Sequence, residues 1–166
     1  MNRNADPAPT REGAGMAIDI RPEILIHRAR PDVAAFMFDP ANDLAWTGGI
    51  TASTPAQPGP LVLGATVQRI AKFLGRTFSY EYRVTAHEPD RLVEMQVDRP
   101  FPMVIRYELD DDQDGATRVA IHTTGSPGGF FGMAAPLMTR QVRNSITADL
   151  RRLRDRLENL TGPPPV

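Results

Sequence analysis

Residues 77–87, T-F-S-Y-E-Y-R-V-T-A-H, alternate between polar and apolar side chains at every step. Successive side chains of a strand point to opposite faces of a sheet, so this stretch predicts a strand with one covered and one solvated face. The apolar set, predicted to point inward, is Phe78, Tyr80, Tyr82, Val84 and Ala86. The polar set, which includes His87, is predicted to point outward.

The same alternation continues on both sides of this strand for about sixty residues, which is typical of consecutive antiparallel strands. The neighbouring strands are expected near Thr66 to Leu74, Arg91 to Val97, Met103 to Leu109 and Thr117 to Thr124. Turn residues separate them, with Gly75-Arg76 and Asp114-Gly115 as the strongest hairpin signals. The acidic residues Asp110, Asp111, Asp112 and Asp114 fit a solvated hairpin tip, and their spacing does not match a calcium loop.

Three elements are expected before this sheet region. Residues 18–26 read as a first strand, with Pro22 at an edge position or a bend because proline donates no ladder hydrogen bond. Pro31 begins a short helix that ends before Asp39-Pro40, and a second short helix covers Ala41 to Ala45. A loop rich in proline and glycine follows, between Pro55 and Gly64.

The cover for the sheet is predicted at the C-terminus, where apolar residues recur every three or four positions. The row is Met138, Val142, Ile146, Leu150, Leu153, Leu157 and Leu160. This spacing indicates an amphipathic helix of about six turns. Arginines dominate its other face, as expected for a solvated surface; the alternative is a basic patch for a phosphate-rich partner. The pattern predicts an α+β fold, with this helix against one face of an antiparallel sheet.

The composition excludes several classes of protein. The chain has 166 residues, 41% of them hydrophobic and 23% charged, which is typical of one globular domain. Its 19 basic and 20 acidic side chains give no electrostatic case for nucleic acid as a partner. No apolar run is long enough to span a membrane, no secretory signal is recognisable, and cysteine is absent. We therefore expect a cytoplasmic protein.

The domain is expected to occupy residues 16–161. Residues 1–15 and 162–166 lack periodicity and are predicted to be disordered tails, with three consecutive prolines in the second. Met16 is an alternative start of the natural chain.

The segment from Val33 to Trp46 resembles a known family. Its spacing of Phe36, Asp39-Pro40, Asn42 and Trp46 is similar to a passage of the helix-grip superfamily, which includes START domains and the SRPBCC proteins. The match is closest to the polyketide cyclase/dehydrase and lipid-transport branch and spans nearly the whole ordered region. The resemblance implies a helix-grip fold, in which a curved antiparallel sheet of about seven strands wraps around the long C-terminal helix. It leaves the function open, because members include cyclases, hydrolases, carriers and receptors.

The resemblance also implies a ligand cavity between sheet and helix, with its mouth near the short helices and the strand loops. Such cavities are mostly apolar with a few placed polar groups. The candidate ligand-binding residues are Trp46, Arg69, Tyr80, Tyr82, Met95, Met103, Tyr107, Phe130, Phe131 and Met138. Phe130 and Phe131 are candidates for a lid. Core packing is the alternative role for each of them, and for Val142 it is the favoured one.

Arg69 has the most specific prediction, because it shares its strand parity with the apolar residues Val67 and Ala71. A buried guanidinium requires a carboxylate, a phenol or an anionic ligand group. One hypothesis is that Arg69 anchors the acidic or carbonyl end of a ligand, with Tyr80 or Tyr82 helping. The alternative is a bulge that turns Arg69 outward and Ile70 inward.

No catalytic constellation is recognisable in the sequence. There is no nucleophile motif, and the three histidines lack metal-ligand spacing, so neither cofactor nor metal is expected. His122, like His87, is predicted to point outward. Three functions stay open: binding of a small hydrophobic molecule such as a lipid, aromatic or polyketide-like metabolite; a cyclase or dehydratase acting on it; and an interaction module with a filled cavity. A homodimer is compatible with the sequence, but no large apolar patch on the sheet requires one.

Overall fold

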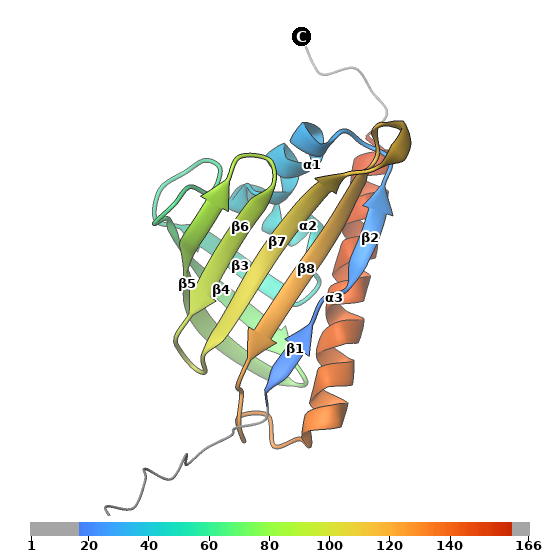
Figure 1. Ribbon diagram of the computed structural model, residues 1–166. Helices are drawn as coiled ribbons and strands as arrows, with labels where there is room; N and C mark the ends of the chain where they lie inside the picture. The colour runs from blue at the N-terminus through green and yellow to red at the C-terminus, as the bar shows by residue number, and fades with distance from the viewer. Residues whose placement is uncertain (1–16, 161–166) are drawn as a thin grey trace, which may run out of the picture.

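A strongly curved antiparallel sheet forms most of the protein (Figure 1). The computed structural model describes residues 17–160, so the predicted tails at 1–15 and 162–166 lie outside the described residues. The strands are β1 (Ile18–Ile20), β2 (Glu23–Ile26), β3 (Ile50–Pro55), β4 (Thr66–Phe73), β5 (Arg76–Glu88), β6 (Leu92–Val97), β7 (Met103–Asp111) and β8 (Thr117–Gly125). They follow the order β1-β8-β7-β6-β5-β4-β3, and β2 also pairs with β8. All pairings are antiparallel.

The helices lie at one end of the sheet and along its concave side. They are α1 (Arg30–Met37), η1 (Pro40–Asn42), α2 (Asp43–Trp46), η2 (Gln113–Gly115) and α3 (Ala135–Glu158). Proline stands in the first turn of both α1 and η1, where its missing N–H costs nothing, and Asp39 caps η1 by accepting a hydrogen bond from the Ala41 amide. The long helix α3 runs beside β1 and β2 (Figure 1). The predicted helix-grip fold is confirmed.

Pro22 divides the predicted first strand in two. Ile20 pairs with Thr123 and Glu23 pairs with Ala120, so β1 and β2 both add to β8. The Pro22 carbonyl still accepts a hydrogen bond from Ile121, although its nitrogen has no proton to donate. The sheet therefore has eight strands.

A β-bulge in β5 corrects the predicted orientation of His87. Val84 pairs with Met95 and Ala86 pairs with Glu94, which leaves Thr85 as an extra residue. One extra residue exchanges the two faces of a strand beyond it. His87 therefore pairs with the buried Val93 on the inner side, and Ala86 lies on the outer side. The outward prediction was wrong for His87 because alternation alone does not reveal a bulge.

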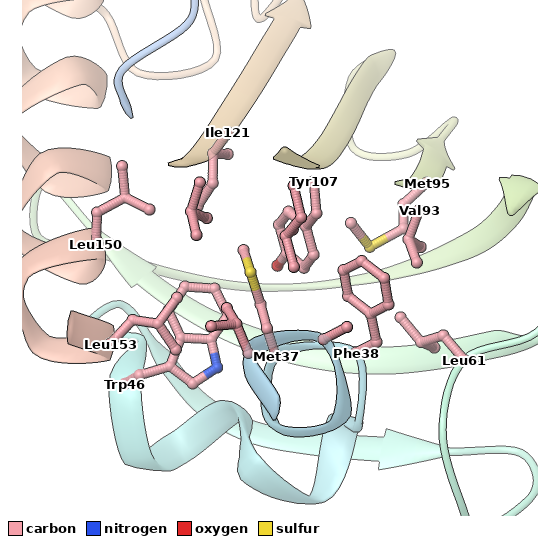
Figure 2. Packing of buried hydrophobic residues seen from close by; sticks show 14 of the residues in the cluster. Met37, Phe38, Trp46, Leu61, Val93, Met95, Tyr107, Ile121, Leu150 and Leu153 are labelled. Carbon is pink, nitrogen blue, oxygen red and sulfur yellow. The ribbon is translucent and has the colours of Figure 1, made fainter. Parts of the chain in front are cut away.

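The main core lies under the short helices (Figure 2). Met37, Phe38 and Trp46 from the helical segment pack against Met95 and Tyr107 of the sheet. Four members of the predicted α3 row are buried, namely Met138, Leu150, Leu153 and Leu157. The last member, Leu160, lies beyond the helix and is exposed.

Candidate functional site

A cavity of about 190 Å³ lies between the N-terminal half of α3 and the concave face of the sheet. Two members of the α3 row, Val142 and Ile146, are only partly buried, and both line this cavity. The sheet side is formed mainly by aliphatic and aromatic residues of β4, β5, β7 and β8. The helix thus packs tightly on the sheet along its C-terminal half and leaves a hollow along its N-terminal half.

The structure brings most of the predicted site residues together around this hollow. Those that line the cavity are Trp46, Arg69, Tyr80, Met103, Tyr107, Phe131 and Met138. Tyr82 and Met95 are fully buried in the main core instead, and Phe130 lies beside the cavity without lining it. Val142, for which core packing was favoured, lines the cavity. Whether any of these residues contacts a ligand stays a prediction.

Five phenylalanines gather at one end of the cavity, where the loop before β7 meets the loop between β8 and α3. They are Phe73, Phe78, Phe101, Phe130 and Phe131. The rings of Phe130 and Phe131 meet edge to face with 4.8 Å between their centroids, and Phe73 lies 5.4 Å from Phe131. Edge-to-face contacts of this kind contribute about 0.5–1.5 kcal/mol each beyond the burial of the rings. These rings form an apolar cover over this end of the cavity.

The opposite end, beneath the short helices, is filled. Met37, Phe38 and Leu61 occupy the space that faces Val93 and Met95 (Figure 2). Trp46 of α2 separates this core from the cavity and meets Tyr107 edge to face at 5.8 Å. The cavity therefore does not extend beneath α1, where the family resemblance suggested part of its mouth.

Arg69 points inward and forms a buried ion pair. Its side chain is 4% exposed, whereas Ile70 is 41% exposed, so the alternative in which a bulge turns Arg69 outward is wrong. Arg69 Nη2 lies 2.7 Å from Asp43 Oδ2, and Arg69 Nε donates a hydrogen bond of 2.9 Å to the same oxygen. The Ser53 hydroxyl also donates a hydrogen bond to this oxygen, at 2.5 Å. The required partner of Arg69 is thus a carboxylate of the protein itself.

Burial by itself would lower the pKa of the Arg69 guanidinium. The surrounding tyrosines and Asp43 outweigh burial and hold that pKa well above its ordinary value. The guanidinium also lies 4.7 Å from the centroid of the Tyr82 ring, a favourable cation–π distance. Arg69 is therefore a charged group inside the wall of an apolar cavity.

Tyr107 lies at the inner end of the cavity beside Arg69. Burial raises the pKa of Tyr107 to about 12, although the nearby guanidinium opposes this rise. Burial also raises the pKa of Tyr82. The phenol of Tyr107 is consequently protonated at neutral pH and is able to donate a hydrogen bond.

The sequence did not single out two carboxylates of this region. Asp43 lies in the first turn of α2, and Asp149 of α3 lines the cavity. The backbone amide of Gly48 donates to Asp149 Oδ1 at 2.9 Å, and Arg152 pairs with the same carboxylate. Burial raises the pKa of Asp149, and the Gly48 amide and Arg152 oppose that rise. In a sequence, an aspartate that points inward looks the same as a solvated one, so nothing marked Asp43. Asp149 had one weak indication of an inward position, because it is next to Leu150 in the apolar row of the helix.

Gly48 leaves room for the side chain of Arg152. A Cβ atom on Gly48 would overlap the guanidinium of Arg152, which donates through Nε to the Trp46 carbonyl at 3.0 Å. These contacts tie the segment after α2 to α3 and hold one wall of the cavity in place.

Four buried polar atoms have no hydrogen-bond partner within residues 17–160: Trp46 Nε1, Tyr82 Oη, Thr123 Oγ1 and Arg106 Nε, of which Arg106 Nε lies 3.2 Å from Glu94 Oε2 in an ion pair. Each carries the cost of a polar group removed from water. Trp46 and Thr123 also line the cavity, so two of these unpaired polar atoms belong to residues of its wall.

Two of the three histidines lie away from the cavity and are paired with carboxylates. His27 Nδ1 lies 3.0 Å from Glu158 Oε1, and His122 Nε2 lies 2.7 Å from Asp19 Oδ1 on the outer side of the sheet. Among the described residues there is no group of three or more potential metal ligands. None of the helices between residues 17 and 160 is long and apolar enough to cross a membrane.

Several solved structures share this fold at low sequence identity. The protein TTHA0849 from Thermus thermophilus has a TM-score of 0.72 at 12% identity, over 87% of this chain and 99% of that one. The Zhui aromatase/cyclase from a Streptomyces species has a TM-score of 0.70 at 12% identity, over 86% and 94% of the two chains. A START superfamily protein from Mycobacterium smegmatis has a TM-score of 0.69 at 10% identity, over 86% and 99%. These likenesses show the fold.

No curated protein matches the sequence. The model of the family described as polyketide cyclase / dehydrase and lipid transport matches residues 17–158, which is nearly the whole described chain. The chain belongs to the polyketide cyclase / dehydrase and lipid transport family.

Proposed function

We propose that the protein binds a small hydrophobic molecule in the cavity between α3 and the sheet. The observation that carries this proposal is a hollow of about 190 Å³ with almost wholly apolar walls, inside a core that is otherwise closely packed. Filling such a hollow with an apolar group is favourable, because its lining atoms lack packing partners on one side. The open hollow also argues against an interaction module whose cavity is filled by its own side chains.

The volume limits the size of the buried group. An apolar cavity of about 150 Å³ is known to accept benzene, and sites for drug-sized molecules measure about 300–1,000 Å³. A cavity of about 190 Å³ therefore accommodates one aromatic ring or a short branched chain. A larger polyketide-like or lipid ligand requires the phenylalanine cover to move or part of the ligand to remain outside.

Trp46 provides a direct test, because it is the single tryptophan of the chain and lines the cavity. We expect p-cresol to change the Trp46 emission in a saturable way and to show saturation transfer from the protein by NMR. Val142→Phe fills part of the cavity and should weaken this binding. Arg143→Phe adds the same ring to the exposed neighbouring position and should leave it unchanged. Binding that is absent in the wild type, or equal in both variants, would contradict the proposal.

A cyclase or dehydratase is the second candidate, and one observation favours it. The protonated phenol of Tyr107 and the charged Arg69 lie together at the inner end of the cavity, where they would polarise a ligand carbonyl. In that case Tyr107→Phe would abolish turnover of a poly-β-ketone substrate and leave its binding nearly unchanged. If Tyr107→Phe instead weakens binding and has no further effect on turnover, the result would favour a carrier.

A further inference from the structure

The charges around the cavity restrict which ligand it accepts. The basic residues along its wall are Arg69 and Lys72, and the acidic one is Asp149. Lys72 alternates with the inward-facing Ala71 on β4 and is exposed, so its ammonium group lies on the outer side. Among the described residues that line the cavity, the guanidinium of Arg69 is therefore the only cationic group that points inward.

The charge of Arg69 is already balanced. Two of its nitrogens, Nε and Nη2, contact one oxygen of Asp43, and both side chains are almost completely buried. The ion pair is held from both sides, because Ser53 of β3 hydrogen bonds the carboxylate and Tyr82 of β5 lies against the guanidinium. A ligand at the inner end of the cavity therefore meets a pair with no net charge.

Asp149 adds negative charge to the opposite wall. Its carboxylate is held by the Gly48 amide and by Arg152, whose side chain is about half exposed. The positive partner of Asp149 thus lies nearer to solvent than Asp149 itself. The wall as a whole is neutral to slightly negative on the side that a ligand would contact.

We infer that the cavity selects an uncharged ring compound bearing a carbonyl or similar acceptor over a carboxylate of the same shape. This inference rests on the proposed function and narrows it to one class of ligand. The sequence suggested that Arg69 anchors either the acidic or the carbonyl end of a ligand. The inference keeps the carbonyl end and excludes the acidic end. The neutral phenol of Tyr107, beside Arg69, is the donor suited to such a carbonyl.

The physical reason is the cost of removing a carboxylate from water. An ion that enters an apolar site needs a compensating charge, and one additional hydrogen bond does not replace its hydration. The Arg69–Asp43 pair cannot supply that charge without being separated. An amide, ketone or ester carbonyl loses much less hydration and gains the same hydrogen bond.

Benzamide and benzoate test this inference on the wild-type chain, because they have nearly the same shape and differ in charge at neutral pH. Affinities would be measured by calorimetry or by the Trp46 emission, with p-cresol as the reference ligand for the cavity. We expect benzamide to bind at least about tenfold more tightly than benzoate. Equal or tighter binding of benzoate, with p-cresol also bound, would overturn this inference and leave the proposed function intact. Failure of all three compounds to bind would refute the proposed function, and the inference with it.

Asp43→Asn is the matched variant, because it removes the charge that balances Arg69 and keeps the size of the side chain. We expect this variant to reduce or reverse the preference for benzamide by increasing benzoate affinity. Asp111→Asn is the control, since it breaks the Arg30–Asp111 pair far from the cavity and should preserve the preference. An unchanged preference in a folded Asp43→Asn protein would refute the assigned role of the pair. If Asp43→Asn does not fold, the relative affinities of the wild-type protein for benzamide and benzoate still test the inference.

Discussion

Arg69→Met is predicted to destabilise the protein strongly. It keeps most of the apolar stem of the side chain and removes the guanidinium from its buried pair with Asp43. Asp43 is 1% exposed and would retain only the hydrogen bond from Ser53. The variant therefore leaves a buried carboxylate without a balancing charge.

The size of the effect follows from this burial. Removing one partner of a buried ion pair costs about 3–5 kcal/mol, whereas replacing both partners is far less costly. For a chain of this length, a loss of that size corresponds to a fall of about 6–20 °C in Tm. The double variant Arg69→Met/Asp43→Asn removes the stranded charge as well, so we expect it to be more stable than Arg69→Met alone.

The measurement is a double-mutant cycle by urea unfolding, followed by circular dichroism. We expect a coupling free energy of about 2 kcal/mol or more between the two positions. The control is Arg91→Met, because the Arg91–Asp110 pair is exposed and 3.8 Å long and should contribute less than about 1 kcal/mol. Additive effects of the two single substitutions, or a loss in Arg69→Met no larger than in the control, would refute the argument.

Two further predictions concern the core and the response to alkali. Leu153→Ala should lower the free energy of unfolding in urea by about 2–5 kcal/mol, because the Leu153 side chain is 0% exposed. Leu137→Ala on the same helix should lower it much less, because Leu137 is 48% exposed. A similar loss at both positions would contradict the assigned packing of α3. The pKa values of Tyr82 and Tyr107 are raised in the folded protein, so as pH rises through about 10 these tyrosines lose their protons in the unfolded chain before they do so in the folded one. The free energy of unfolding should therefore fall above that pH. Absorbance at 295 nm checks this, and ionisation of all three tyrosines near pH 10 in the folded protein would contradict it.

Some elements of the fold follow from local patterns alone. The alternation in residues 77–87 identified the inner face of β5 up to Val84, because the period of a strand is a property of the strand itself. The three- and four-residue spacing from Met138 onward identified the buried side of α3 for the same reason. The parity of Arg69 correctly predicted that it points inward.

The remaining features depend on contacts between distant parts of the chain. The bulge at Thr85 is visible only in the pairing of β5 with β6, and it turned His87 to the inner side. Asp43 became the partner of Arg69 because the short helix α2 packs against the sheet, and 26 positions in the sequence separate the two residues. No periodicity carries that information.

The composition and alternation of the chain established a domain with a sheet covered on one face by a C-terminal helix, since burial of apolar surface requires such a cover. Only the tertiary structure established which inward side chains pack and which surround empty space. Val142 and Leu150 belong to the same helical row, yet one lines the cavity and the other is buried in the core. This difference depends on which residues lie opposite each position, and pairings between strands that are distant in the sequence bring those residues there.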